Sequence, residues 1–169
     1  MGIYKILPFF YLFFTILLTN TFPADAKTLL PAASSAEETT LLHDPESLLG
    51  MNLKEAYSVF GAPDEITVHR NENPQYDDVV FIYKPLHVSF FWFENRVWVI
   101  RFHSGYEKNI LGVRPGMKKE EVMTSLNYTS REIENSLVFF LKDRGFPVRL
   151  RVYFTNDIVN DIYLYRGDF

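Results

Sequence analysis

The chain has 169 residues, a net charge of −4 and no cysteine, and 17% of its residues are aromatic. This length suits one domain or two very small ones, and the lack of cysteine excludes disulfides, thiol catalysis and a lipid anchor on cysteine. Residues 27–109 carry seven Lys/Arg and twelve Asp/Glu, whereas residues 110–169 carry nine and eight. This acidic to neutral balance disfavours nucleic acid as a partner, because phosphate binding needs a basic surface.

Residues 1–26 have the features of a secretory signal peptide. Lys5 provides a short basic start, and residues 6–18 form a nearly continuous apolar run that is too short for a comfortable membrane span. An Ala-Asp-Ala cleavage pattern then predicts a mature chain that begins at Lys27. The alternative is an uncleaved N-terminal anchor. We therefore expect an exported protein of the bacterial cell envelope, in the periplasm, at the outer surface or in the medium.

Residues 27–47 are rich in Ala, Ser, Thr and Glu and contain Pro31 and Pro45. This composition predicts a flexible linker. His43 and Asp44 form a polar pair in this segment, but in a linker they are more simply interpreted as solvated side chains.

A Gly-Met sequence followed by a short amphipathic segment occurs twice, at residues 50–61 and 116–127. In the first copy Asn52 is a good N-cap, and Glu55 three residues later predicts a capping box. Gly61 favours the left-handed backbone that ends a helix. The apolar residues of this helix share one face, because they follow the i, i+3, i+4, i+7 spacing: Leu53, Ala56, Tyr57 and Phe60.

The second copy places Val122, Met123 and Leu126 at the apolar positions. Lys118 replaces the capping asparagine, so we expect this helix to begin less sharply. A chance match is the alternative, but strand-rich sequence follows both copies, and such self-similarity indicates repeated units. We predict an α+β fold of two tandem units, 48–109 and 110–169, each with short helices packed on one face of an antiparallel sheet.

Eight segments between these helices and the chain's end have the alternating or continuous apolar pattern of strands. They are 64–70, 79–83, 86–93, 97–103, 131–135, 137–141, 148–154 and 158–165. The hairpin of the third and fourth segments is apolar on both faces and contains Trp92 and Trp98. One face should cover the helix. The other should meet the second unit, the linker or a partner protein.

The last predicted hairpin alternates cleanly between apolar and polar side chains. Its outward face carries Arg149, Arg151, Tyr153, Tyr163 and Tyr165. We expect Phe154 to pair with Ile158, which places Arg151 opposite Asp161. This register also leaves Asn160 on the inner face, where its amide costs free energy. Arg and Tyr are frequent at interface hot spots, so this face is either a contact surface or an ordinary solvated one.

The sequence from Gly50 to Glu65 resembles the opening of the BamE/SmpA family of small outer-membrane proteins. That family has a Gly-Met-Ser/Thr start, an acidic residue and a Phe/Leu-Gly-x-Pro ending. Residues 116–126 resemble the pattern again, whereas residues 127–129 depart from its ending. Two such units in tandem resemble the architecture of the β-lactamase inhibitor protein. The resemblance implies a non-enzymatic envelope or secreted protein that binds other proteins, although the BamE/SmpA family is anchored through a cysteine that this chain lacks.

The sequence contains no group of residues with the spacing of a catalytic or metal site. His87 and His103 lie at the ends of strands predicted to pair, and with a carboxylate they could hold zinc, but no close-spaced ligand motif accompanies them. The acidic loop with Glu72, Asp77 and Asp78 lacks the ligand pattern of an EF-hand. We expect no catalytic residue, cofactor, metal or small-molecule substrate.

The sequence therefore predicts an exported, non-enzymatic binding module that contacts a partner protein through the open faces of its sheets. The residues expected to form the contact are Trp92, Trp98, Arg149, Arg151, Tyr153 and Tyr163. The first alternative is a structural or outer-membrane-assembly accessory protein without a dedicated partner. The second is a metal-dependent enzyme.

Overall fold

The computed structural model describes residues 44–70, 72, 74 and 77–168. These residues form two α-helices, two 3-10 helices and eight strands. The elements in chain order are η2 (Pro45–Leu48), α2 (Leu53–Phe60), β1 (Glu65–His69), β2 (Asp78–Tyr83), η4 (Lys84–Leu86), β3 (Val88–Phe93), β4 (Arg96–Phe102), α3 (Lys119–Ser125), β5 (Ser130–Ile133), β6 (Ser136–Phe140), β7 (Val148–Thr155) and β8 (Ile158–Arg166).

The predicted signal peptide, 1–26, and most of the predicted linker, 27–47, lie outside the described residues. Within the described part of the chain, the helices are too short or too polar to cross a membrane.

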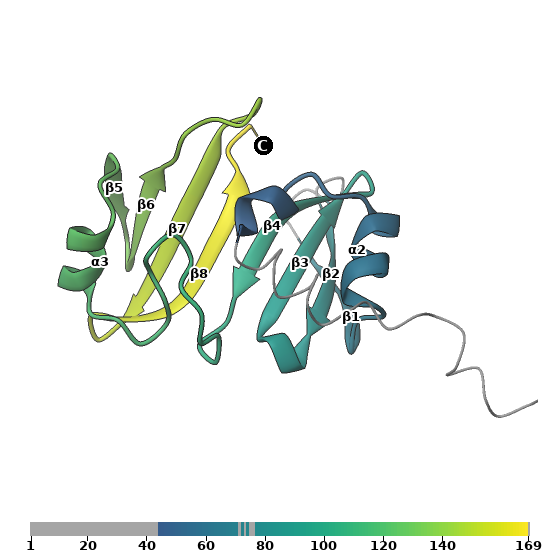
Figure 1. The fold of residues 1–169 in the computed structure, drawn as a ribbon, viewed down its shortest axis with the longest axis horizontal. Helices are drawn as coiled ribbons and strands as arrows, with labels where there is room; N and C mark the ends of the chain where they lie inside the picture. The colour runs from purple at the N-terminus through teal and green to yellow at the C-terminus, as the bar shows by residue number, and fades with distance from the viewer. Residues whose placement is uncertain (1–43, 71, 73, 75–76, 169) are drawn as a thin grey trace, which may run out of the picture. The chain divides into compact units, whose positions relative to one another are not determined.

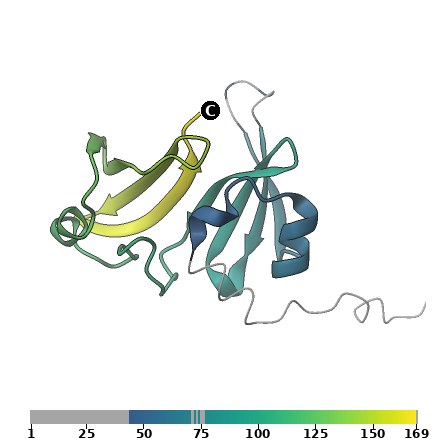
Figure 2. The ribbon, with the colours of Figure 1, turned by 45° about the horizontal axis from the view of Figure 1, so that its top comes forward.

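The eight strands form one antiparallel sheet in the order β1-β2-β3-β4-β8-β7-β6-β5. The two halves of the chain meet where β4 pairs with β8, with Ile100 opposite Leu164 and Phe102 opposite Ile162. These four side chains are fully buried. Figures 1 and 2 both show the yellow β8 beside the teal β4.

The prediction of two tandem α+β units, each with its own sheet, is therefore wrong. A four-stranded sheet from either half alone would leave the backbone groups along β4 or β8 without partners, which is unfavourable for a buried strand. Pairing β4 with β8 satisfies both edges and merges the two halves into one sheet with one continuous apolar core. The predicted boundary between residues 109 and 110 falls in the loop between β4 and α3 and stays a prediction.

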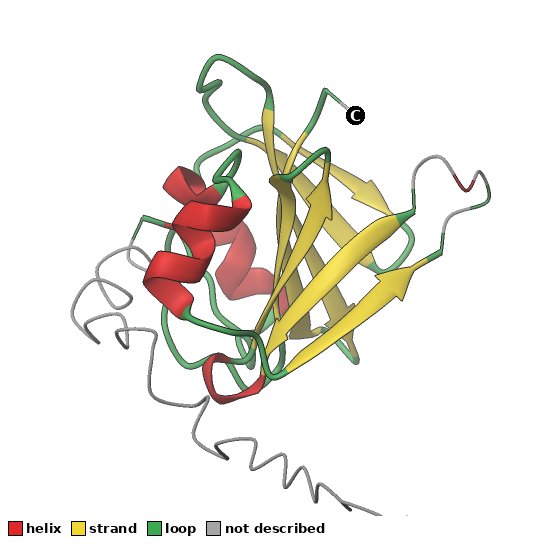
Figure 3. Ribbon diagram, turned by 90° about the vertical axis from the view of Figure 1, so that its right-hand side faces the viewer, coloured by secondary structure: helices red, strands yellow, loops and turns green. Residues whose placement is uncertain are grey.

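The α-helices lie on one face of the sheet (Figure 3). Alternate residues of the strands point towards them, and these residues form the core together with Leu48, Ala56 and Val122. The burial pattern is clearest in β7, where Val148, Leu150 and Val152 are buried and the residues between them are half-exposed. The opposite face of the sheet is not covered by these helices.

The two helices begin as their sequences predict. At α2 the Asn52 Oδ1 accepts from the Glu55 N–H at 3.0 Å and Glu55 Oε2 accepts from the Asn52 N–H at 2.9 Å, so the capping box is confirmed. At α3 the Lys118 N–H donates to Glu121 Oε2 at 2.7 Å, but a lysine ammonium has no lone pair with which to accept the reciprocal bond. Only half of the capping box is therefore present at α3.

The predicted register of the last hairpin is wrong. Phe154 pairs with Val159 instead of Ile158, and Tyr153 pairs with Asp161, so Asn160 is an extra residue in a β-bulge. The bulge turns Asn160 out to solvent, where its side chain donates to Asp161 at 3.0 Å. The free energy cost of a buried amide is thereby avoided. Beyond the bulge, each residue of β7 pairs with a residue one position further along β8 than it would without the extra residue.

Candidate functional site

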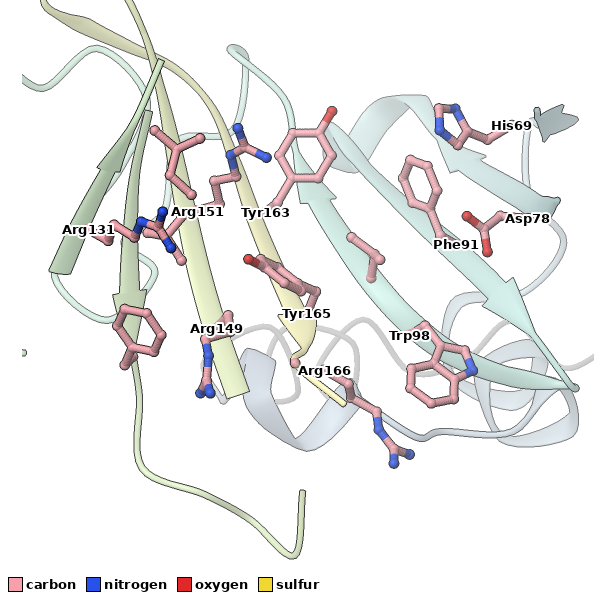
Figure 4. Close-up of a pocket in the computed structure, with 15 residues that line it drawn as sticks. His69, Asp78, Phe91, Trp98, Arg131, Arg149, Arg151, Tyr163, Tyr165 and Arg166 are labelled. Carbon is pink, nitrogen blue, oxygen red and sulfur yellow. The ribbon is translucent and has the colours of Figure 1, made fainter. Parts of the chain in front are cut away.

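A hollow of about 520 Å³ lies on the open face of the sheet. Each of the eight strands contributes at least one side chain to it. Figure 4 shows Arg131, Arg149 and Arg151 on its β5–β8 side and His69 with Asp78 on the β1–β2 side. The hollow is therefore cationic at one end.

Arg149 is held by contacts that leave most of its guanidinium donors unused. Its Nη1 donates to the Val148 carbonyl at 2.9 Å, and its Cζ lies 4.7 Å from the centre of the Phe140 ring. Gly167 lies beside this side chain, and a Cβ there would be 3.0 Å from the Arg149 Cγ. The glycine therefore leaves room for the arginine to lie against the chain.

Arg151 is positioned by a buried serine. Its Nε donates to Ser136 Oγ at 2.9 Å, and that hydroxyl donates in turn to the Ile133 carbonyl at 2.7 Å. Its Cζ lies 4.6 Å from the centre of the Tyr153 ring. Ser136 is only 1% exposed, so the guanidinium is hydrogen-bonded to a buried side chain of the sheet.

The arginines of the open face fall into two groups. Arg101 bonds to Asp161 at 3.0 Å, and Arg166 bonds to Asp168 at 2.7 Å. Among the described residues, no carboxylate forms an ion pair with the other three, which are Arg131, Arg149 and Arg151. A guanidinium carries five N–H donors, so these three side chains can bind an anion without giving up an existing partner.

Aromatic side chains form the middle of the hollow. Tyr163 lies between Tyr153 and Phe91, with ring centres 5.2 and 6.4 Å away. Trp98 packs beneath Arg166, whose Cζ is 4.2 Å from its ring centre. Burial raises the pKa of the Tyr163 phenol, and it also raises the pKa of Tyr165. Both phenols therefore keep their proton at neutral pH and can donate a hydrogen bond.

The structure separates the six residues predicted to bind a partner. Trp98, Arg149, Arg151 and Tyr163 line the hollow, and Tyr153 contacts two of them. Trp92 points to the other face, where it is 5% exposed within the core. Its Nε1 has no hydrogen-bond partner among the residues that the structure describes. The role of all six in binding stays a prediction.

Other residues of the hollow were not singled out from the sequence. They include His69, Phe91, Arg131 and Arg166. Phe91 alternates with the core residues Phe90 and Trp92, so its place on the open face could have been inferred. The strands of His69 and Arg131 contain no buried residue, and Arg166 is two residues from the buried Leu164, so alternation would not have placed these three. Their convergence depends on the order of the strands, which no local pattern reveals.

His103, one of the two histidines considered for zinc, makes other contacts. His103 Nε2 lies 2.7 Å from Ser89 Oγ, and His103 Nδ1 lies 3.9 Å from Asp161 Oδ1. Burial lowers the pKa of His103 and the charge of Arg101 lowers it further, whereas Asp161 acts in the opposite direction. In the described part of the chain, no three His, Cys, Asp or Glu side chains are grouped as metal ligands would be.

No family model matches the chain, and no curated protein matches it. Among solved structures, it is similar to an extracellular protein containing a SCP domain from Bacillus anthracis str. Ames, with 14% identity, a TM-score of 0.49 and coverage of 72% of this chain and 45% of that chain. A cysteine-rich secretory protein from Staphylococcus aureus subsp. aureus Mu50 is similar at 17% identity and a TM-score of 0.45, over 72% of this chain and 44% of that chain.

The chain thus spans less than half the length of either structure. The two TM-scores are too low to establish a shared fold, and the descriptions belong to those proteins. The resemblance to the BamE/SmpA family and to the β-lactamase inhibitor protein is wrong. No family model supports it, and the two helices that follow the repeated Gly-Met sequences lie against one sheet instead of forming two units.

Proposed function

We propose that this protein is an exported, non-enzymatic binding module that holds a partner protein in the hollow of its open sheet face. One observation supports this most. Three arginines lie in the same hollow as several aromatic side chains, and none of the three forms an ion pair with another described residue. Arginine, tyrosine and tryptophan are enriched at interface hot spots. Tyrosine and tryptophan bury much surface at a low cost in conformational entropy, because they have few rotatable bonds.

Export is proposed from the sequence of residues 1–26, with its basic start, apolar run and Ala-Asp-Ala cleavage pattern. A location in the periplasm, at the cell surface or in the medium is compatible with it.

Capture of the partner tests this function. The full chain, produced with its own leader and tagged at its C terminus, serves as bait in an envelope fraction, and the captured protein is identified, purified and titrated back. The double variant Arg151→Ala with Tyr153→Ala removes one charge and one ring from the open face. The control, Arg114→Ala with Tyr128→Ala, removes the same groups from exposed positions outside the hollow.

We expect the wild type and the control to bind the purified protein with equal affinity and the hollow variant to bind it at least about ten-fold more weakly. Equal binding by all three folded proteins contradicts the proposal. It would instead favour an accessory protein whose open face is a solvated surface.

A further inference from the structure

The charges of the hollow are opposite to those of the protein as a whole. The chain carries a net charge of −4, yet Arg131, Arg149 and Arg151 face one hollow. A concave surface with charges of one sign focuses the electric field, because the protein around it is less polarisable than water. The local field in the hollow therefore attracts anions although the whole molecule repels them.

The chemistry of the donors favours carboxylates. Arginine presents parallel N–H groups that match the two oxygens of a carboxylate, and such charge-assisted bonds are stronger than neutral ones. Carboxylates of this chain already occupy Arg101 and Arg166 on the same face. The same pairing is available at Arg149 and Arg151, whose side-chain hydrogen bonds within the described part of the chain go to the Val148 carbonyl and the Ser136 hydroxyl.

The spacing of the donors favours an extended ligand over a single ion. Arg149 and Arg151 are two residues apart on β7, and Arg131 lies across β6 on β5, where it is paired with Val138. Positions two residues apart in one strand are separated by about 6–7 Å, which is also the spacing of alternate side chains in an extended peptide. Tyr163 and Tyr165 add phenol donors and flat apolar surface beside them.

We propose that the hollow binds an extended acidic segment of the partner protein, with carboxylates on Arg149, Arg151 and Arg131. This inference rests on the proposed function, and it names the chemistry of the partner. A phosphate polymer is the less favoured anion, because nucleic-acid binding needs a broad basic surface and Asp78 lies at the opposite end of the same hollow.

The test measures fluorescence anisotropy of a labelled oligo-glutamate peptide at low salt. An oligo-glutamine peptide of equal length and a single-stranded oligonucleotide serve as comparison probes. The hollow variant is Arg149→Gln with Arg151→Gln. The control, Lys54→Gln with Lys108→Gln, also removes two positive charges, from exposed side chains outside the hollow.

We expect oligo-glutamate to bind the wild type and the control, and to bind the hollow variant at least about ten-fold more weakly. Oligo-glutamine should not bind. Binding should also weaken with added salt, since exposed charges are screened. Equal loss in both variants means a response to net charge alone and overturns the proposal, as does preferential binding of the oligonucleotide.

The captured partner separates this inference from the function on which it rests. The partner could fail to bind the Arg151→Ala, Tyr153→Ala variant yet bind the Arg149→Gln, Arg151→Gln variant normally. That result would support the binding module and overturn the proposal that the partner's bound segment is acidic. If no partner is captured and oligo-glutamate does not bind, both are wrong.

Discussion

His103 shows how one half-buried side chain links stability to pH. It lies against Ser89, near Asp161 and Arg101, and the pKa of its ring is lowered mainly by burial. The unfolded chain therefore takes up a proton on this residue before the folded protein does as the pH falls. The contribution to the free energy of unfolding is complete above the ordinary histidine pKa and is lost as the pH falls through the lowered one.

We predict that wild-type protein loses more stability than His103→Gln between about pH 8 and pH 5. Glutamine keeps a polar group next to Ser89 and does not titrate, so the difference between the two proteins isolates His103 from the carboxylates and from His87. Urea unfolding at several pH values measures it. Parallel loss of stability in both proteins would show that His103 does not titrate differently on folding.

The two helix starts provide a matched pair of caps. Replacing Asn52 by alanine removes the side chain that accepts the Glu55 N–H, so the free energy of unfolding should fall by about 0.5–2 kcal/mol. The same change at Lys118 removes no accepting group and should cost less. Denaturant titration of both variants checks this. A larger loss at Lys118 would mean that the capping bond is not what stabilises the start of α2.

At the scale of elements, the pattern of the sequence identified the strands but not their neighbours. The alternation in residues 148–154 predicted β7 and its two faces, and the structure extends it only to Thr155. The prediction missed the bulge at Asn160, because it assumed that each residue of one strand pairs with one residue of the other. The β4–β8 pair was missed because it joins segments about 60 residues apart, as in the bond of Arg101 to Asp161.

The centre and the edge of the sheet should respond differently to the same substitution. Ile100 on β4 is 0% exposed and pairs with Leu164, whereas Ile66 on the edge strand β1 is 59% exposed. Ile100→Ala should lower the free energy of unfolding by about 2–5 kcal/mol. Ile66→Ala should change it by less than about 0.5 kcal/mol. Similar losses at both positions would contradict the central role of the β4–β8 pair.

At the scale of the molecule, one sheet with one core predicts one unfolding transition. Trp92 and Trp98, on β3 and β4, report on the first half of the sheet through fluorescence, and far-ultraviolet circular dichroism reports on all eight strands. We predict that the two urea curves of the wild type coincide. Separate midpoints would mean that the two halves unfold independently.

The candidate site was predictable in part. The outward face of β7 and β8 follows from alternation, so Arg149, Arg151 and Tyr163 could be named from the sequence. Trp92 could not be separated from Trp98, because β3 and β4 are apolar on both faces and alternation alone does not say which face the helices cover. The hollow itself depends on the strand order, which places Phe91 next to Tyr163.

The central claim is that a partner protein occupies the hollow, and photo-crosslinking in the producing cells tests it most directly. A photoreactive residue is placed at Val99, which lines the hollow, or at Val79, which is 41% exposed and lies outside it. We predict that Val99 crosslinks to one defined protein and that Val79 does not. Crosslinking to the same protein from both positions, or from Val79 alone, would contradict the claim.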